Sequence, residues 1–267
     1  MTPAPSKLAR AFLGGFLVLC FSTGLIHTAM GQPNGSDGVG AASYPFQEKI
    51  LEYVLGDSIP SDGRFVYYWP RQDTAYKGDD VPHLGTASNI DYLGTRLSTV
   101  RGNRGTHCVG ITWQVGMSVL EDWVQGFDST GAIAGMSLED MREFVRRWFV
   151  KEGEGGRLST PEQTGVVYAL ESFGLGRPIE FEEAQPGDFV QFWRLDGSGH
   201  SCVFLRWVYD AEGNIIGFHY WGSQPQTDGI GTDTEYFHPN ELVLEPDRLL
   251  DRDRFYIGRL APLSTGR

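Results

Sequence analysis

Apolar residues recur at helical spacing over the first two thirds of the chain, and capping residues bound each run. The run at residues 108–123 leaves few polar positions, which predicts a largely buried helix. The other runs carry signals such as an N-cap residue, a proline in the first turn or a terminal glycine. Besides 108–123, helices are predicted at residues 45–56 and from Ser137 and Thr160 onward.

The pattern changes after Pro178, where short apolar runs alternate with turn sequences. Pro186-Gly187-Asp188 is a turn that opens one run, and the next two runs are joined by a turn at residues 210–214. Strands are predicted at residues 189–193, 200–209, 215–221 and 255–260, and an earlier one at 64–69. Helices followed by antiparallel strands predict an α+β fold.

The N-terminus has the three parts of a secretory signal. Lys7 and Arg10 are followed by an apolar run at residues 11–26 and by small residues at Ala29 and Gly31. The run is short and interrupted by glycine, which favours a cleaved signal over an uncleaved membrane anchor. The domains predicted are a signal peptide at 1–31, a flexible lead-in at 32–43 and a single domain at 44–267. The mature protein is predicted to be secreted or periplasmic, without stable membrane insertion.

Net charge limits the partners of the protein. The formal net charge is −12 at pH 7. Nucleic acid binding depends on neutralisation of phosphates by lysine and arginine, so the charge argues against nucleic acid as a partner. The charge does not argue against a small substrate that binds in a local cleft.

Two cysteines remain after the predicted signal is removed, and Cys108 is a candidate nucleophile. It stands where a glycine-rich loop turns into the buried helix, and the N–H groups of a helix start favour a thiolate. A nucleophilic thiol needs an imidazole base. His200 fits best, because it follows an open loop and begins a strand. The other histidines lie in the signal, in polar loops, beside the cysteine or in the middle of a strand.

The hairpin after His200 suggests which residue orients its ring. The turn centres near Glu212, and residues at equal distance from the centre of an antiparallel hairpin lie opposite each other. Gln224 is then the partner of His200, and Ser223 replaces it if the centre shifts by half a residue. The amide oxygen of a glutamine can accept the ring N–H and fix the tautomer.

These pieces together resemble the NlpC/P60 superfamily of papain-like cysteine hydrolases. The similarity rests on Cys108 at a helix start, the Pro186 to Trp193 turn and strand, and Gly199-His200 opening the next strand. The resemblance implies a papain-like fold with helices packed on an antiparallel sheet. It also implies hydrolysis of an amide or peptide bond in a peptide or peptidoglycan-like substrate, without cofactor or metal. The family's third site residue lies on the strand after the histidine, which agrees with Gln224.

Other interpretations of the same residues remain open. Two cysteines in an exported chain also suggest a Cys108–Cys202 disulfide, either in a non-catalytic binding domain or as a reversible mask of the nucleophile. His107, Cys108, His200 and Cys202 have ligand types suited to zinc, although their spacing is poor. Asp188 is interpreted as a carboxylate that stabilises a turn.

Overall fold

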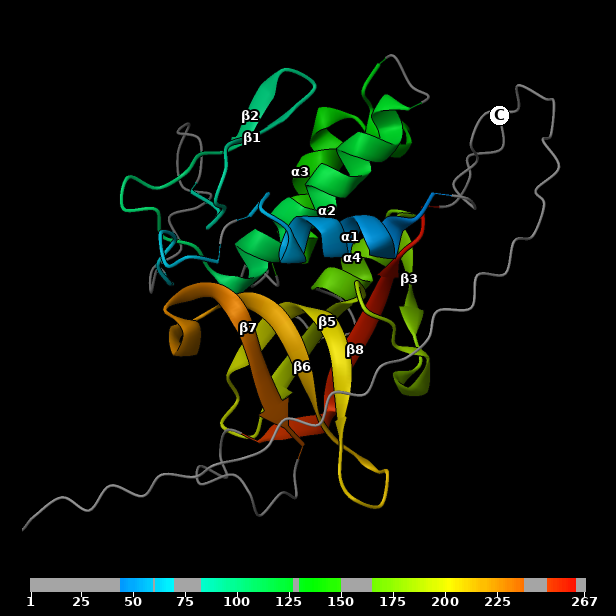
Figure 1. The fold of residues 1–267 in the computed structure, drawn as a ribbon. Helices are drawn as coiled ribbons and strands as arrows, with labels where there is room; N and C mark the ends of the chain where they lie inside the picture. Colours follow the sequence, from blue (N-terminus) through cyan, green and yellow to red (C-terminus); the bar gives the residue numbers. More distant parts are fainter. Residues whose placement is uncertain are drawn as a thin grey trace, which may run out of the picture. The chain divides into compact units, whose positions relative to one another are not determined.

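In the part of the chain that the structure describes, four α-helices pack on one face of a six-stranded antiparallel sheet, which confirms the α+β prediction (Figure 1). The computed structural model describes residues 44–59, 61–69, 83–126, 130–149, 165–237 and 249–262. The predicted signal peptide, the lead-in and the helix start at Thr160 lie outside the described residues. Within the described part, no helix is long and apolar enough to cross a membrane.

The helices form where the apolar spacing predicts them. Helix α1 spans Phe46–Leu55, α2 spans Cys108–Gln125, α3 spans Leu138–Trp148 and α4 spans Val166–Ser172. Helix α3 begins with a capping box, in which Ser137 and Asp140 each accept the other's backbone N–H. Helix α2 is buried along most of its length and packs against the sheet, so it forms the centre of the helical layer.

The sheet has the strand order β3-β8-β4-β5-β6-β7. Its strands are β3 (Gly176–Ile179), β4 (Phe189–Arg194), β5 (Gly199–Tyr209), β6 (Ile215–Gln224), β7 (Gly229–Tyr236) and β8 (Leu250–Leu260). The four strands predicted after Pro178 are β4, β5, β6 and β8. The two edge strands were missed, because Pro178 lies in β3 and β7 is mostly polar.

The predicted strand at 64–69 is wrong. Only Tyr67 makes a ladder contact, a single parallel bridge to Thr106, through hydrogen bonds of 2.8 and 2.9 Å. A separate hairpin of β1 (Ile90–Tyr92) and β2 (Thr95–Ser98) forms instead between this segment and α2. The residues at 64–69 have strand-like composition, but no strand among the described residues forms a ladder with them.

Each face of the sheet carries its own apolar core. The first core lies between the helices and the sheet and includes Cys108, Phe189 and Val203. The second core includes Val190 and Cys202. All six residues of β4 are buried because this strand contributes side chains to both.

Candidate active site

Cys108 is the first residue of α2, as predicted, and its neighbours fix the start of this helix. His107 is the N-cap, and its Nδ1 accepts the N–H of Gly110 at 3.2 Å. Gly110 lets the backbone of Leu84 approach closely, since a Cβ at Gly110 would lie 2.0 Å from the Leu84 carbonyl oxygen. The helix start is therefore held from two sides, and the thiol of Cys108 has a fixed position.

The β5–β6 hairpin contains two bulges that cancel each other. Tyr209 pairs with Ile215 beside the turn, and Val203 pairs with Trp221 at the far end, with register shifts between them. Because the two shifts have opposite senses, the register at Val203 is the same as the register beside the turn. Continuing the register three residues beyond Val203 places His200 level with Gln224, as the sequence predicted.

Strands β5 and β6 separate at the end that carries His200 and Gln224. Their pairing stops at Val203 and Trp221, whereas His200 still pairs with Phe192 of β4. Gln224 still pairs with Gly229 of β7 on the other side. The sheet is therefore open between β5 and β6 at this end.

The start of α2 is joined to both strands at this opening. The hydroxyls of Thr106 and Ser223 lie 2.8 Å apart, and those of Thr112 and Ser201 lie 3.2 Å apart. The backbone N–H of Ser201 acts on the sulfur of Cys108 as a hydrogen-bond donor and favours the thiolate. The nucleophile candidate thus lies beside the residue that follows His200.

Gln224, rather than Ser223, lies on the same side of the sheet as His200. A Cβ at Gly222 would lie 3.3 Å from both His200 Nε2 and Gln224 Oε1, so these atoms face the same small space. The Gln224 side chain is close enough to favour the protonated ring of His200. The pair does not meet strict hydrogen-bond geometry, because His200 Nε2 and both amide atoms of Gln224 are buried without a partner in the described residues.

Cys108 and His200 line one cleft of about 440 Å³. No hydrogen bond joins the thiol and the imidazole in the part of the chain that the structure describes. Such contacts often tighten only when substrate binds. The rest of the lining is uncharged and rich in aromatic residues, and comprises Tyr67, Trp69, Val109, Phe149, Gln191, Trp193, Gly197, Ser198, Gly199 and Ser201.

Burial governs the protonation of both groups. It raises the pKa of the Cys108 thiol, against the opposing effects of the Ser201 and Val109 N–H groups and of the positive charge of Arg194. Burial also lowers the pKa of His200 to about 3, with a further contribution from Arg194 and opposition from Gln224. The resting pair at neutral pH is therefore a thiol and a neutral imidazole, which differs from the activated thiolate that the helix start predicted.

The raised thiol pKa has a direct consequence for alkylation. The rate at which iodoacetamide modifies Cys108 should keep rising with pH beyond about pH 9, because only the thiolate reacts. Mass-spectrometric mapping of the Cys108 peptide across a pH series measures this rate, with the urea-unfolded protein as the reference. A plateau already present below about pH 7 would instead mean that a thiolate–imidazolium pair forms at rest.

The two cysteines are both buried free thiols. They belong to different cores, and burial raises the pKa of Cys202 well above its ordinary value. Among the described residues, no group of three or more His, Cys, Asp or Glu side chains could hold a metal ion.

An ion pair close to His200 was not predicted from the sequence. The Arg194 guanidinium binds both carboxylate oxygens of Glu235 at 2.6 and 2.5 Å, and the Tyr220 hydroxyl donates to the same carboxylate at 2.6 Å. The His200 ring lies between Phe192 and Tyr220, with ring centroids 5.5 and 5.4 Å away. These residues come from four strands, β4 to β7, so only the sheet topology brings them together.

Tyr67 was also missed as a site residue. Its side chain lines the cleft, and burial and the proximity of Cys108 raise the pKa of its phenol to about 12. Its position follows from the bridge to Thr106, which lies two residues before Cys108. No local pattern distinguishes it from Tyr68 beside it.

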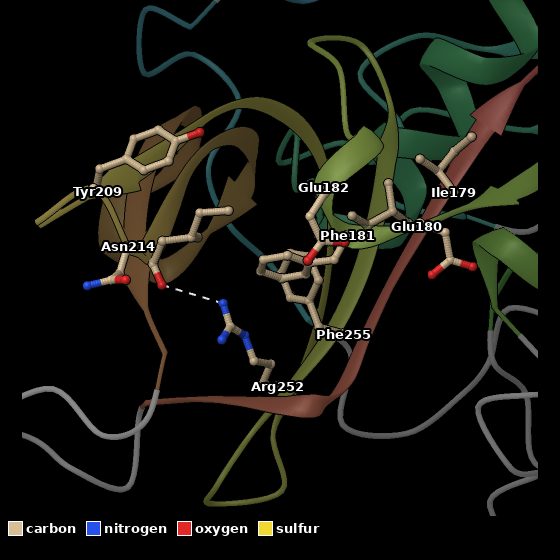
Figure 2. A pocket seen from close by; sticks show the side chains of 11 residues that line it. Ile179, Glu180, Phe181, Glu182, Tyr209, Asn214, Arg252 and Phe255 are labelled. Carbon is tan, nitrogen blue, oxygen red and sulfur yellow. Dashed lines mark hydrogen bonds between the residues drawn. The ribbon is translucent and has the colours of Figure 1, made fainter.

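A second cavity, of about 640 Å³, shares no lining residue with this cleft. It lies between the short 3-10 helix η3 (Phe181–Glu183), the β5–β6 turn and β8 (Figure 2). Figure 2 shows Arg252 beside Phe255 and Phe181, with a hydrogen bond to the Ile215 carbonyl oxygen. Its described lining contains no Cys, His, Ser or Thr, so this cavity offers no counterpart to the Cys108 and His200 pair.

Comparisons with family models, with curated proteins and with solved structures find no match to this chain. The site geometry and the motif resemblance are therefore what a functional proposal rests on.

Proposed function

We propose that this protein is an exported cysteine hydrolase of the papain-like, NlpC/P60 type that cleaves an amide or peptide bond. Cys108 is the nucleophile, His200 its base and Gln224 the residue that orients His200. The observation that carries the proposal is the opening between β5 and β6. At this opening the Cys108 sulfur lies beside the Ser201 N–H, and His200 faces Gln224.

The proton route follows from the orientation of the imidazole. Nε2 of His200 faces Gln224, so Nδ1 is the nitrogen that accepts the thiol proton. The sulfur attacks the carbonyl carbon as the proton leaves, and the protonated ring then donates that proton to the departing amine. Water hydrolyses the thioester with the same ring as base, which restores the thiol and releases the acid.

The transition state carries a negative oxygen that needs hydrogen-bond donors. The first N–H groups of a helix have no partner within it, so the Cys108 N–H is available for this oxygen. The Tyr67 phenol is a second donor in the cleft, and its raised pKa keeps it protonated through the neutral range.

Acyl-enzyme trapping tests the proposal without knowledge of the natural substrate. The protein is mixed with p-nitrophenyl acetate, quenched in acid and digested, and the acetyl group is located by mass spectrometry. The expected product is a thioester on the Cys108 peptide that is absent in His200→Ala. Acetylation that avoids Cys108, or recovery of a Cys108–Cys202 cross-linked peptide from the native protein, would favour the binding-domain alternative.

Gln224 should act on the rate through His200. Gln224→Ala leaves the ring without its facing amide, and we expect kcat to fall about 10- to 100-fold with little change in KM. Ser223→Ala is the matched control, because Ser223 bonds to Thr106 instead of facing His200. An equal fall in kcat in the two variants would mean that the end of β6 only supports the site structurally and that Gln224 has no specific effect on His200.

A further inference from the structure

The cleft around Cys108 is walled by aromatic rings from both layers of the fold. On the helix side, Trp69 packs edge-on against His107 at 4.9 Å, and His107 packs against Phe149 at 6.0 Å. We call Trp69 and Phe149 the helix-side wall, since both line the cleft and the His107 ring contacts both. On the sheet side, Trp193 of β4 lines the same cleft, held by Arg254 over its ring at 4.9 Å and by Tyr256 at 5.9 Å.

One ring of the helix-side wall is open to a ligand. Trp69 is 50% exposed although it lines the cleft, whereas Trp193 is 8% exposed. A large, half-exposed indole beside a buried thiol offers a flat apolar face next to the reacting atom. Aromatic side chains bury 150–250 Å² on such surfaces and gain further from ring–ring contact.

The described lining of the cleft carries no fixed charge that would select an ionic substrate. Among its described lining residues there is no Asp, Glu, Lys or Arg. The Arg194 guanidinium, whose charge acts on Cys108 and His200, is paired with the Glu235 carboxylate. The chain as a whole carries a formal charge of −12, which disfavours approach of an anionic substrate at low salt.

We infer that the cleft selects an amide substrate whose acyl part is uncharged and carries an aromatic ring next to the scissile carbonyl. This inference rests on the proposed function. The acyl part becomes bonded to Cys108 in the first step and is released only in the second, whereas the amine leaves in the first. The aromatic walls around Cys108 are therefore a binding site for the acyl side chain, with Trp69 as the specificity-determining residue.

Matched activated esters test this selectivity. N-acetyl p-nitrophenyl esters of phenylalanine, glutamate and lysine are compared by the second-order rate of Cys108 acylation, each normalised to its rate with hydroxide. The phenylalanine ester should react at least about tenfold faster than the other two. In Trp69→Ala this preference should fall to near unity, and Trp69→Phe should restore most of it.

Tyr209→Ala is the control for a general effect of removing an exposed ring, because Tyr209 is 55% exposed and lines the other cavity. It should leave the preference unchanged. Equal rates for the three esters, or a preference that survives in Trp69→Ala, would overturn the inference while the proposed function stands. Failure of every ester to acylate Cys108 would reject the proposed function itself, and the inference with it.

Discussion

Replacing Cys108 by alanine should abolish amide hydrolysis and leave the protein folded. Loss of the nucleophile in a thiol or serine hydrolase lowers kcat by roughly 10³- to 10⁶-fold, because the remaining groups cannot form the acyl intermediate. The thiol is buried but small, so its removal should cost only about 1 kcal/mol of unfolding free energy. Steady-state hydrolysis of a preferred substrate and urea unfolding followed by circular dichroism measure the two effects separately.

Cys202→Ala is the matched control for the Cys108 variant. It also removes one buried thiol, but from the second core, and most of the activity should remain. A binding domain cross-linked through both cysteines behaves differently. In that case both variants would lose about 2–5 kcal/mol of stability, and neither would change a rate. Equal destabilisation without a catalytic difference would therefore contradict the enzyme proposal.

Replacing Asp188 by alanine should strongly destabilise the fold. Its carboxylate is fully buried and accepts two hydrogen bonds of 2.8 Å from Arg259, on β8, and one of 2.8 Å from the Gln185 N–H. Removing one partner of a buried ion pair leaves the other charge uncompensated, which costs about 3–5 kcal/mol. The midpoint of urea unfolding should fall accordingly, with an unchanged dependence on urea concentration.

Asp62→Ala is the comparison for the Asp188 variant. Asp62 also pairs with an arginine, Arg64, but both side chains are exposed and screened by solvent. The unfolding midpoint of this variant should stay close to that of the parent. If the Asp188 variant were no less stable than the Asp62 variant, Asp188 would have no role in holding the turn before β4 to β8. Loss of activity without loss of stability would point to a chemical role instead.

The hairpin shows why a simple rule could locate part of the site. Glu212 is separated from His200 and from Gln224 by the same number of residues along the chain. This predicts that His200 and Gln224 pair only if the hairpin has no net bulge. The structure has two bulges, one on each strand, and their effects cancel before Val203. With the bulge on β5 alone the partner of His200 would have been Ser223, and with the bulge on β6 alone it would have been Pro225. The success of the rule therefore depended on a feature that the local sequence does not reveal.

Other residues of the site could not be identified from the sequence, because their contact partners lie far away along the chain. Arg194 and Glu235 lie in β4 and β7, with two strands between them in the sheet. Tyr67 owes its place beside Cys108 to one bridge with Thr106. An isolated tyrosine or arginine carries no signal of such a contact, because its neighbours in sequence are not its neighbours in space.

The sequence by itself determined the α+β class, the start of α2 at Cys108, and the strands that carry His200 and Gln224. Helix caps, apolar periodicity and turn residues act over a few positions, so they can be read along the chain. The tertiary structure alone decided that β5 and β6 separate at the site, that Gln224 and not Ser223 faces His200, and that aromatic rings from both layers wall the cleft. It also decided the protonation of Cys108 and His200, because burial depends on residues that only the folded chain packs around them.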